Sequence, residues 1–256
     1  MIGFNGGLIG GLANARDTSS AKSNPGVWTL DEQRKAIFSV PRAWPDALTL
    51  PDIGDAYQGG FYAGLISHSQ DSVATHALIV APRATGASGT GYTLTTNYQW
   101  KTSNTNTSGA NNVFDGAVNE TAIVTAGLAA HPAANFCSGL TIDGYTDWYL
   151  PSRYELQIAF FNLKPSTASN STSFGINPYS VPERTTNHTA GLPAQTSVAA
   201  FQSGGSEAFE AAGHWSSTEP TSSTSPFVFY FGDGVPGQFI GCTATERCRA
   251  FRKVPI

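Results

Sequence analysis

Charged side chains are scarce in this chain of 256 residues. Asp, Glu, Lys and Arg together make up 12% of it, about half the share that is usual in soluble proteins. The net charge is −4, and no cluster of Lys and Arg offers the phosphate contacts that nucleic-acid binding requires. A surface rich in Gly, Ser, Thr and Asn but poor in charge is typical of loop-rich extracellular or virion proteins. It is atypical of cytosolic enzymes.

Cysteines and long apolar runs are also lacking. The three cysteines, Cys137, Cys242 and Cys248, are too few for a disulfide framework, and their odd number leaves at least one free thiol in a monomer. Cys242 and Cys248 could close a small loop, whereas the spacing fits no pattern of zinc ligands. No apolar run approaches the roughly 20 residues that span a bilayer, so we expect no membrane insertion.

The first residues, "MIGFNGGLIGGLANARD", lack a basic segment ahead of their apolar part and make a poor secretory signal. We expect the protein either to stay in the cell that makes it or to leave by another route, such as release in a virus particle. Thr29 and Glu32 form a capping-box pattern, which predicts a short helix over 30–39. Such a helix is too short to be stable alone. We therefore predict that residues 1–50 form an extended arm that docks onto a neighbour.

The remainder, residues 51–256, has the pattern of one α+β domain. Its two ends carry apolar, β-branched and aromatic runs typical of strands, and its middle carries the spacing of three helices. The predicted strands are 54–66, 75–82, 214–218, 226–234 and 247–254, the predicted helices are 114–130, 131–140 and 152–163, and 164–194 is predicted to be an ordered loop. This order predicts an antiparallel sheet formed by both ends of the domain.

The densest stretch is "GYTDWYLPSRYEL", residues 144–156, which holds Asp147, Arg153 and Glu155. A carboxylate pair can support acid–base catalysis. However, Glu155 stands three residues after Ser152 at a predicted helix start, and Asp147 lies in a turn, so structural roles are favoured. The chain contains no nucleophile elbow, zinc-binding helix or phosphate-binding loop. We predict no catalytic residue, no metal site and no cofactor, and therefore no enzyme.

Several of these segments, taken in order, resemble a known family. "GDAYQGGFYAGLI", "ATHALIVAP", "FDGAVNETAIV", "AANFCSGLTIDGYTDWYLPSRYEL", "HWSSTE", "FVFYFGDG" and "CRAFRKV" resemble the C-type-lectin-like C-terminal domain of bacterial collagen-like adhesins, which also occurs in phage virion proteins. The likeness covers roughly residues 52–254. It implies a C-type-lectin-like fold with a mixed or antiparallel sheet, two to three helices and long loops.

The resemblance also assigns structural roles to particular residues. Aromatic side chains on strands usually face the interior, which independently favours the core for the tryptophans. The resemblance implies that Trp148, Leu150 and Pro151 pack the junction between helix and sheet, that Trp215 starts a strand of a second small sheet, and that Arg249 and Arg252 lie on the closing strand.

The family's calcium-dependent sugar binders carry a Glu-Pro-Asn or Gln-Pro-Asp triplet and a Trp-Asn-Asp triplet, whereas this chain has "EPT" at 219–221 and no Trp-Asn-Asp. Calcium-dependent binding is therefore not expected. The recognition loops would be "STEPTSSTSP" and "GDGVPGQFIGCTATER", which are polar loops between apolar strands. The side chains predicted to contact a glycan or a protein surface there are Glu219, Asp233, Gln238 and Arg247.

The N-terminal "MIGFNGG…GVWTLDEQ…WP" resembles the start of many tailed-phage structural proteins. It implies an arm that attaches the domain to other virion proteins through Phe4, Trp28 and Trp44. We therefore expect a homo-oligomeric virion protein, assembled in the host cytoplasm, that acts as a tail-fibre or adhesin component. The alternatives are a capsid or neck decoration protein with a structural role, or an oxidase-like relative of the fold.

Overall fold

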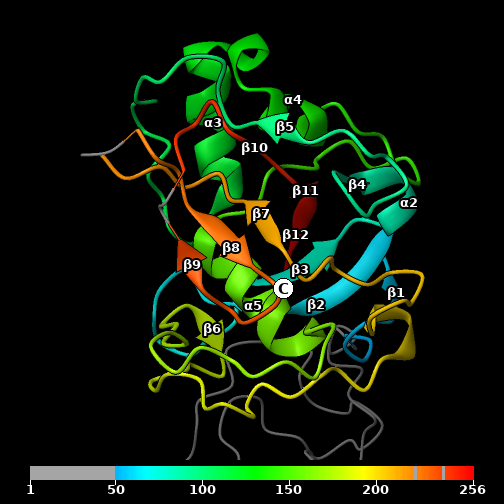
Figure 1. Ribbon diagram of the computed structural model, residues 1–256. Coiled ribbons are helices and arrows are strands. Elements are labelled where there is room, and N and C mark those ends of the chain that lie inside the picture. Colours follow the sequence, from blue (N-terminus) through cyan, green and yellow to red (C-terminus); the bar gives the residue numbers. More distant parts are fainter. Residues whose placement is uncertain (1–49, 222–223, 238–239) are drawn as a thin grey trace, which may run out of the picture. The chain divides into compact units, whose positions relative to one another are not determined.

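The computed structural model describes residues 50–221, 224–237 and 240–256 (Figure 1). The compact unit that holds them runs from Leu50 to Ile256. The predicted N-terminal arm, with its helix and with Phe4, Trp28 and Trp44, lies outside the described residues, as does Gln238.

The main sheet combines the first and the last strands of this unit, as the sequence predicts. Its order is β1–β2–β3–β12, β6 also pairs with β2, and every pairing between these strands is antiparallel. The strands are β1 (Ala56–Tyr57), β2 (Gly60–Ile66), β3 (His76–Val80), β6 (Ser180–Val181) and β12 (Phe251–Pro255). The unit is thus α+β with antiparallel sheets, which confirms the predicted class.

Two glycines let β2 pack closely. The Gly59–Gly60 pair predicts a bulge or a close backbone approach. At Gly60 the approach is close, because a Cβ atom there would lie 2.3 Å from the carbonyl oxygen of Val80. The bulge lies farther along, between Tyr62 and Gly64, where Gly64 has a φ of 132° that favours glycine.

All three predicted helices are present, and the third begins at its predicted capping box. The Asp115 carboxylate accepts hydrogen bonds from the amides of Ala117 and Val118, and the Ser152 amide donates to Glu155 Oε2 over 2.7 Å. The helices are α3 (Gly116–Gly127), α4 (Pro132–Ser138) and α5 (Arg153–Leu163).

A fourth helix, α2 (Arg83–Gly86), and the 3-10 turn η2 (Ala199–Phe201) were not predicted, whereas the 3-10 turn η1 (Leu128–Ala130) is the last part of the predicted helix 114–130. The expected number of two to three helices is therefore too low, because α2 is a single turn inside a stretch that reads as loop.

Three smaller sheets complete the unit. Within the described residues, three of their seven strands lie in the predicted late strands, and the other four lie in segments that were predicted as loops. β7 (Gly213–Trp215), β8 (Val228–Tyr230) and β9 (Pro236–Gly237) form one, β5 (Tyr98–Gln99) pairs with β10 (Thr245–Glu246), and β4 (Ala87–Ser88) pairs with β11 (Cys248–Arg249).

Trp215 ends β7 rather than starting it. Arg252 lies on β12, the closing strand of the main sheet, whereas Arg249 lies on the preceding β11.

The core has two apolar clusters. One surrounds the buried indoles of Trp100, Trp148 and Trp215, and the other surrounds Phe160 and Phe251. Helix α5 contacts both β2 and β8, so it joins the main sheet to the three-stranded sheet (Figure 1). Among the described residues, no helix combines the length and apolar character needed to cross a membrane.

Candidate functional site

The guanidinium of Arg252 ties the 144–156 segment to the last strand. Its Nε and Nη2 donate to the two carboxylate oxygens of Asp147 over 2.8 and 3.0 Å, and its Nη1 donates to the carbonyl oxygen of Gln58 over 3.0 Å. Its Cζ lies 3.9 Å from the ring centroid of Tyr145. The carboxylate of Asp147 is therefore held in a bidentate pair, a geometry that orients both groups firmly.

Two tight turns lie beside this pair. Gln58 and Gly59 have φ angles of 45° and 82°, and Asp143 and Gly144 have φ angles of 52° and 79°. Positive φ at both central residues is the requirement of the turn that best joins twisted antiparallel strands. A Cβ atom at Gly59 would lie 2.7 Å from a ring carbon of Tyr145, so the two turns pack without room for a larger residue.

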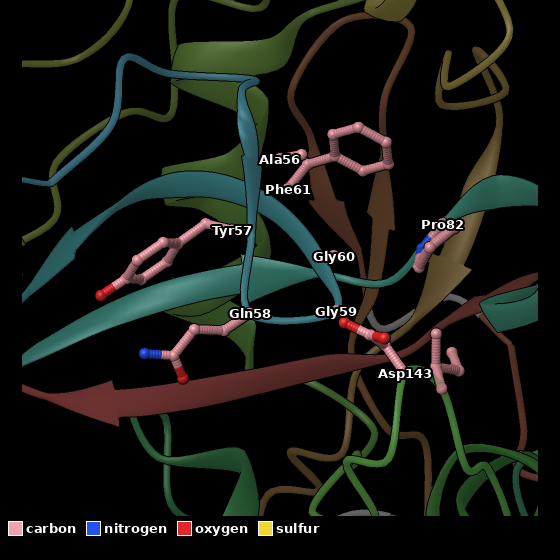
Figure 2. A pocket seen from close by; sticks show the side chains of 9 residues that line it. Ala56, Tyr57, Gln58, Gly59, Gly60, Phe61, Pro82 and Asp143 are labelled. Atoms are coloured by element: carbon pink, nitrogen blue, oxygen red, sulfur yellow. The ribbon is translucent and has the colours of Figure 1, made fainter.

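A hollow of about 430 Å³ opens at these turns. Figure 2 shows Tyr57 and Gln58 on one side of the β1–β2 hairpin and Phe61 on the other, with Pro82 and Asp143 beyond Gly60. Its described lining residues are Ala56, Tyr57, Gln58, Gly59, Gly60, Phe61, Pro82, Ile142 and Asp143. Asp143 is the one carboxylate in that lining, so the hollow suits binding better than acid–base catalysis by a carboxylate pair.

The other carboxylate of the segment, Glu155, is fully buried. It accepts hydrogen bonds from the Ser152 amide, the Gly116 amide and the Tyr149 hydroxyl, over 2.7, 3.1 and 2.7 Å respectively. Burial raises the pKa of Glu155 to about 7, against the opposing effect of these donors. The side chain therefore joins the starts of α3 and α5, which is a structural position.

Glu219 is not placed as a surface ligand contact, which corrects the prediction made for it. Its side chain is 1% exposed, and its Oε2 accepts a hydrogen bond from the Thr107 amide over 2.6 Å. Residues 216–219 are all buried, and the carboxylate is bonded to the 101–107 loop through Thr107. Burial raises the pKa of Glu219. A glycan would have to open this loop to reach the carboxylate.

The other predicted ligand residues have separate surroundings. Asp233 accepts a hydrogen bond from the Val235 amide in the turn between β8 and β9. Arg247 donates from Nε to the carbonyl oxygen of Thr90 over 2.6 Å and lies 3.7 Å from the carboxylate of Glu246. Glu219, Asp233 and Arg247 share no contact that would gather them into one site, and Gln238 lies outside the described residues.

All three cysteines are free and buried, so the loop closure considered for Cys242 and Cys248 does not occur. Burial raises the pKa of each thiol, most strongly for Cys137 and Cys248. A thiolate is the reactive form of cysteine, and burial disfavours it. Within the described part of the chain, no group of three or more His, Cys, Asp or Glu side chains is placed to hold a metal ion.

Buried cations are the feature that reasoning from the sequence missed. Arg249 is fully buried, Lys101 is 8% exposed and Lys164 is 1% exposed. The Lys101 ammonium donates to the carbonyl oxygens of Thr105 and Asn106, which holds the 101–107 loop. No local pattern marks such residues, because their acceptors come from backbone carbonyls whose direction depends on the fold.

Comparison with known proteins provides no family: no family model matches the chain, and no curated protein matches it. The interpretation of the site therefore depends on its geometry and on the residues themselves.

Glu120, on α3, gives a prediction about pH. Both of its carboxylate oxygens are buried and accept no hydrogen bond from the described residues, because the nearby Ser138 hydroxyl donates to the carbonyl oxygen of Ala134. Burial raises the pKa of Glu120 to about 7, against a smaller lowering by the Ser138 hydroxyl. The unfolded value is roughly 4.3. The folded state thus holds the proton more tightly, and this contribution to stability is lost as pH rises from about 4 to about 7. Glu120→Gln should therefore stabilise the protein at about pH 8, by about 1–2 kcal/mol, and weaken its pH dependence.

Urea unfolding of wild type and variant at about pH 5 and about pH 8 tests this expectation. Glu183→Gln is the matched control, because Glu183 is exposed and should give the same stability as wild type. A Glu120→Gln protein that is less stable than wild type at the higher pH would show that the carboxylate has a partner in solution.

Proposed function

We propose that this chain is a structural protein of a phage virion, in which Leu50–Ile256 is a C-type-lectin-like domain displayed for recognition of a host surface. The observation that carries the proposal is the pairing of β12 with β3, which puts the last strand of the unit into the sheet that β1 and β2 begin. The chain between β3 and β12 contains long connections rich in Gly, Ser and Thr. Helix α5 and the three small sheets lie in the same part of the chain and support these loops. This arrangement agrees with the fold that the sequence resemblance implies.

The carboxylates of the 144–156 segment favour recognition over catalysis, because both already have hydrogen-bond partners within the protein. Asp147 is paired with Arg252, and Glu155 is engaged by three donors at two helix starts. The buried thiols with raised pKa values disfavour the oxidase-like alternative, which would need accessible reactive cysteines. The hollow at the β1–β2 turn and the polar loops offer binding surfaces instead.

In this proposal, residues 1–49 attach the domain to other virion proteins, and the particle carries several copies as a tail-fibre or adhesin component. Truncation of residues 1–45 should leave a folded unit, because both core clusters lie within Leu50–Ile256. The truncated protein should no longer join the particle.

Circular dichroism of the truncated protein, together with gradient purification of particles assembled in its presence, measures both effects. Full-length protein treated in parallel is the control. A truncated protein that sediments with particles as full-length protein does would sink the assignment of the arm. Antibody labelling that places the chain at the neck or capsid would favour a decoration role over a tail-fibre role.

A further inference from the structure

The end of α5 carries a lysine whose amino group is enclosed by the protein. Lys164 is the C-cap of the helix and is 1% exposed. Its Nζ donates to the carbonyl oxygens of Ala168 and Pro193 and to Oδ1 of Asn170. Among the described residues, Lys164 has no ion pair with a carboxylate. A buried ammonium without such a partner is costly, so burial favours the neutral amine.

The side-chain amide of Asn170 is also enclosed and is held in one orientation. Asn170 is 5% exposed, and its Nδ2 donates to the carbonyl oxygens of Thr189 and Pro193 over 3.0 and 2.9 Å. Its Oδ1 lies 2.6 Å from Nζ of Lys164. Because a C=O bond is about 1.23 Å long, Nζ lies no farther than about 3.8 Å from the amide carbon Cγ. This limit is near the roughly 3–3.5 Å that separates two atoms placed to react.

A carboxylate acts on this pair from a neighbouring turn. The amide of Ser171, the residue after Asn170, donates to the carbonyl oxygen of Asp233 over 2.9 Å. This bond ties the loop after α5 to the turn between β8 and β9. Burial lowers the pKa of Lys164, and the Asp233 carboxylate opposes this with a smaller raising effect. The charge of Asp233 therefore acts at Nζ, which makes its carboxylate the acceptor for a proton from Lys164.

A lysine surrounded by oxygen atoms can also be purely structural, and Lys101 is the example in this chain. The Nζ of Lys101 donates to two backbone carbonyl oxygens and to a threonine hydroxyl. Lys164 differs because one of its acceptors, Oδ1 of Asn170, belongs to a primary amide. The nitrogen of a primary amide can leave as ammonia without breaking the main chain. The pair of Lys164 and Asn170 therefore has an amine and an amide carbon in position for a chemical step that Lys101 lacks.

We propose that Lys164 and Asn170 join in an intramolecular isopeptide bond. The neutral Nζ attacks Cγ of Asn170, the bond between Nζ and Cγ forms, and the bond between Cγ and Nδ2 breaks. The Asp233 carboxylate takes the proton that Nζ loses and gives it to Nδ2, which leaves as ammonia. The exchange of one amide for another is redox-neutral, so it needs no co-reactant. The product is a covalent ring over residues 164–170 that fixes the end of α5 to the following loop, a modification beyond the recognition role proposed above.

Mass spectrometry of a tryptic digest of the full-length protein tests the bond. Trypsin cleaves after Arg153 and Arg184 but not at the Lys164–Pro165 bond, so the proposed ring lies within the single peptide 154–184. This peptide should be lighter than its sequence mass by one molecule of ammonia. Its fragment spectrum should lack the ions that come from breaking one backbone bond between 164 and 170, because the ring keeps the two pieces joined.

Two variants remove the reacting groups one at a time. K164R keeps a buried cation but replaces the amine with a guanidinium that stays protonated, and N170A removes the amide carbon. Both should give the 154–184 peptide at its full mass. K101R is the matched control, and its 154–184 peptide should still lack one ammonia. D233N should form the bond roughly a hundredfold more slowly, measured in protein sampled at intervals after expression begins, because it has no carboxylate to carry the proton.

A wild-type 154–184 peptide at full mass, from protein that a melting curve shows to be folded, would overturn the inference. A lighter peptide that keeps the fragment ions between 164 and 170 would also overturn it, since that pattern marks a succinimide at Asn170. Equal rates of ammonia loss in wild type and D233N would overturn the proton route through Asp233. If K164R or N170A fails to fold, the wild-type digest decides by itself.

Discussion

Trp215→Ala is expected to lower the free energy of unfolding by roughly 3–5 kcal/mol, because it empties a large buried site. The indole is fully buried and its Nε1 donates to the carbonyl oxygen of Tyr98 over 2.7 Å, which connects β7 to β5. A loss of this size is a large part of the net stability of a domain. Urea unfolding followed by tryptophan fluorescence and circular dichroism measures it. Trp148→Ala should act in the same direction, because that side chain is 2% exposed.

Trp215→Phe is the matched control, since it keeps an aromatic ring but loses the hydrogen bond, and it should cost less than the alanine variant. If Trp215→Ala kept full stability and lost only ligand binding, the indole would be an exposed platform and the assignment to the core would be wrong.

Arg249→Met should lower the free energy of unfolding by a similar amount, roughly 3–5 kcal/mol. The substitution removes the buried cation but leaves its buried hydrogen-bond acceptors in place. The guanidinium is fully buried and donates to the carbonyl oxygens of Ala81 and Glu207 and to the carboxylate of Glu207. Its Cζ also lies 4.6 Å from the ring centroid of Phe209. Methionine fills part of the volume but leaves the buried carbonyl oxygens without donors.

Glu207→Gln should be milder than Arg249→Met, because the guanidinium keeps its two carbonyl acceptors. Thermal and urea unfolding of both single variants and of the double variant gives the coupling between the two side chains. An Arg249→Met protein as stable as wild type would show that Arg249 is replaceable by apolar packing, and that the network is not needed for stability.

The elements that were predicted correctly have signals within a few residues. Helix α5 begins where Ser152 and Glu155 stand three residues apart, and α3 begins after Asp115. Strands β2 and β3 lie in mainly apolar runs, and β12 lies in the predicted strand 247–254, where Phe251 and Val254 flank two charged residues. The elements that were missed are short. Strands β4, β5 and β10 have two residues each, and each exists because a partner distant in the sequence supplies its hydrogen bonds.

The sequence by itself determined the α+β class, the pairing of the two ends of the domain, the three longer helices and the interior character of Trp148 and Trp215, because caps, periodicity and apolar runs act locally. Only the tertiary structure decided where the charges lie. It buried Glu219 and Arg249, paired Asp147 with Arg252, and placed the guanidinium groups of Arg153 and Arg184 over aromatic rings. A charged residue has the same neighbours in the sequence whether it is solvated, paired or unpaired in the fold. Its partner comes from a segment far away in the chain, which only folding brings close.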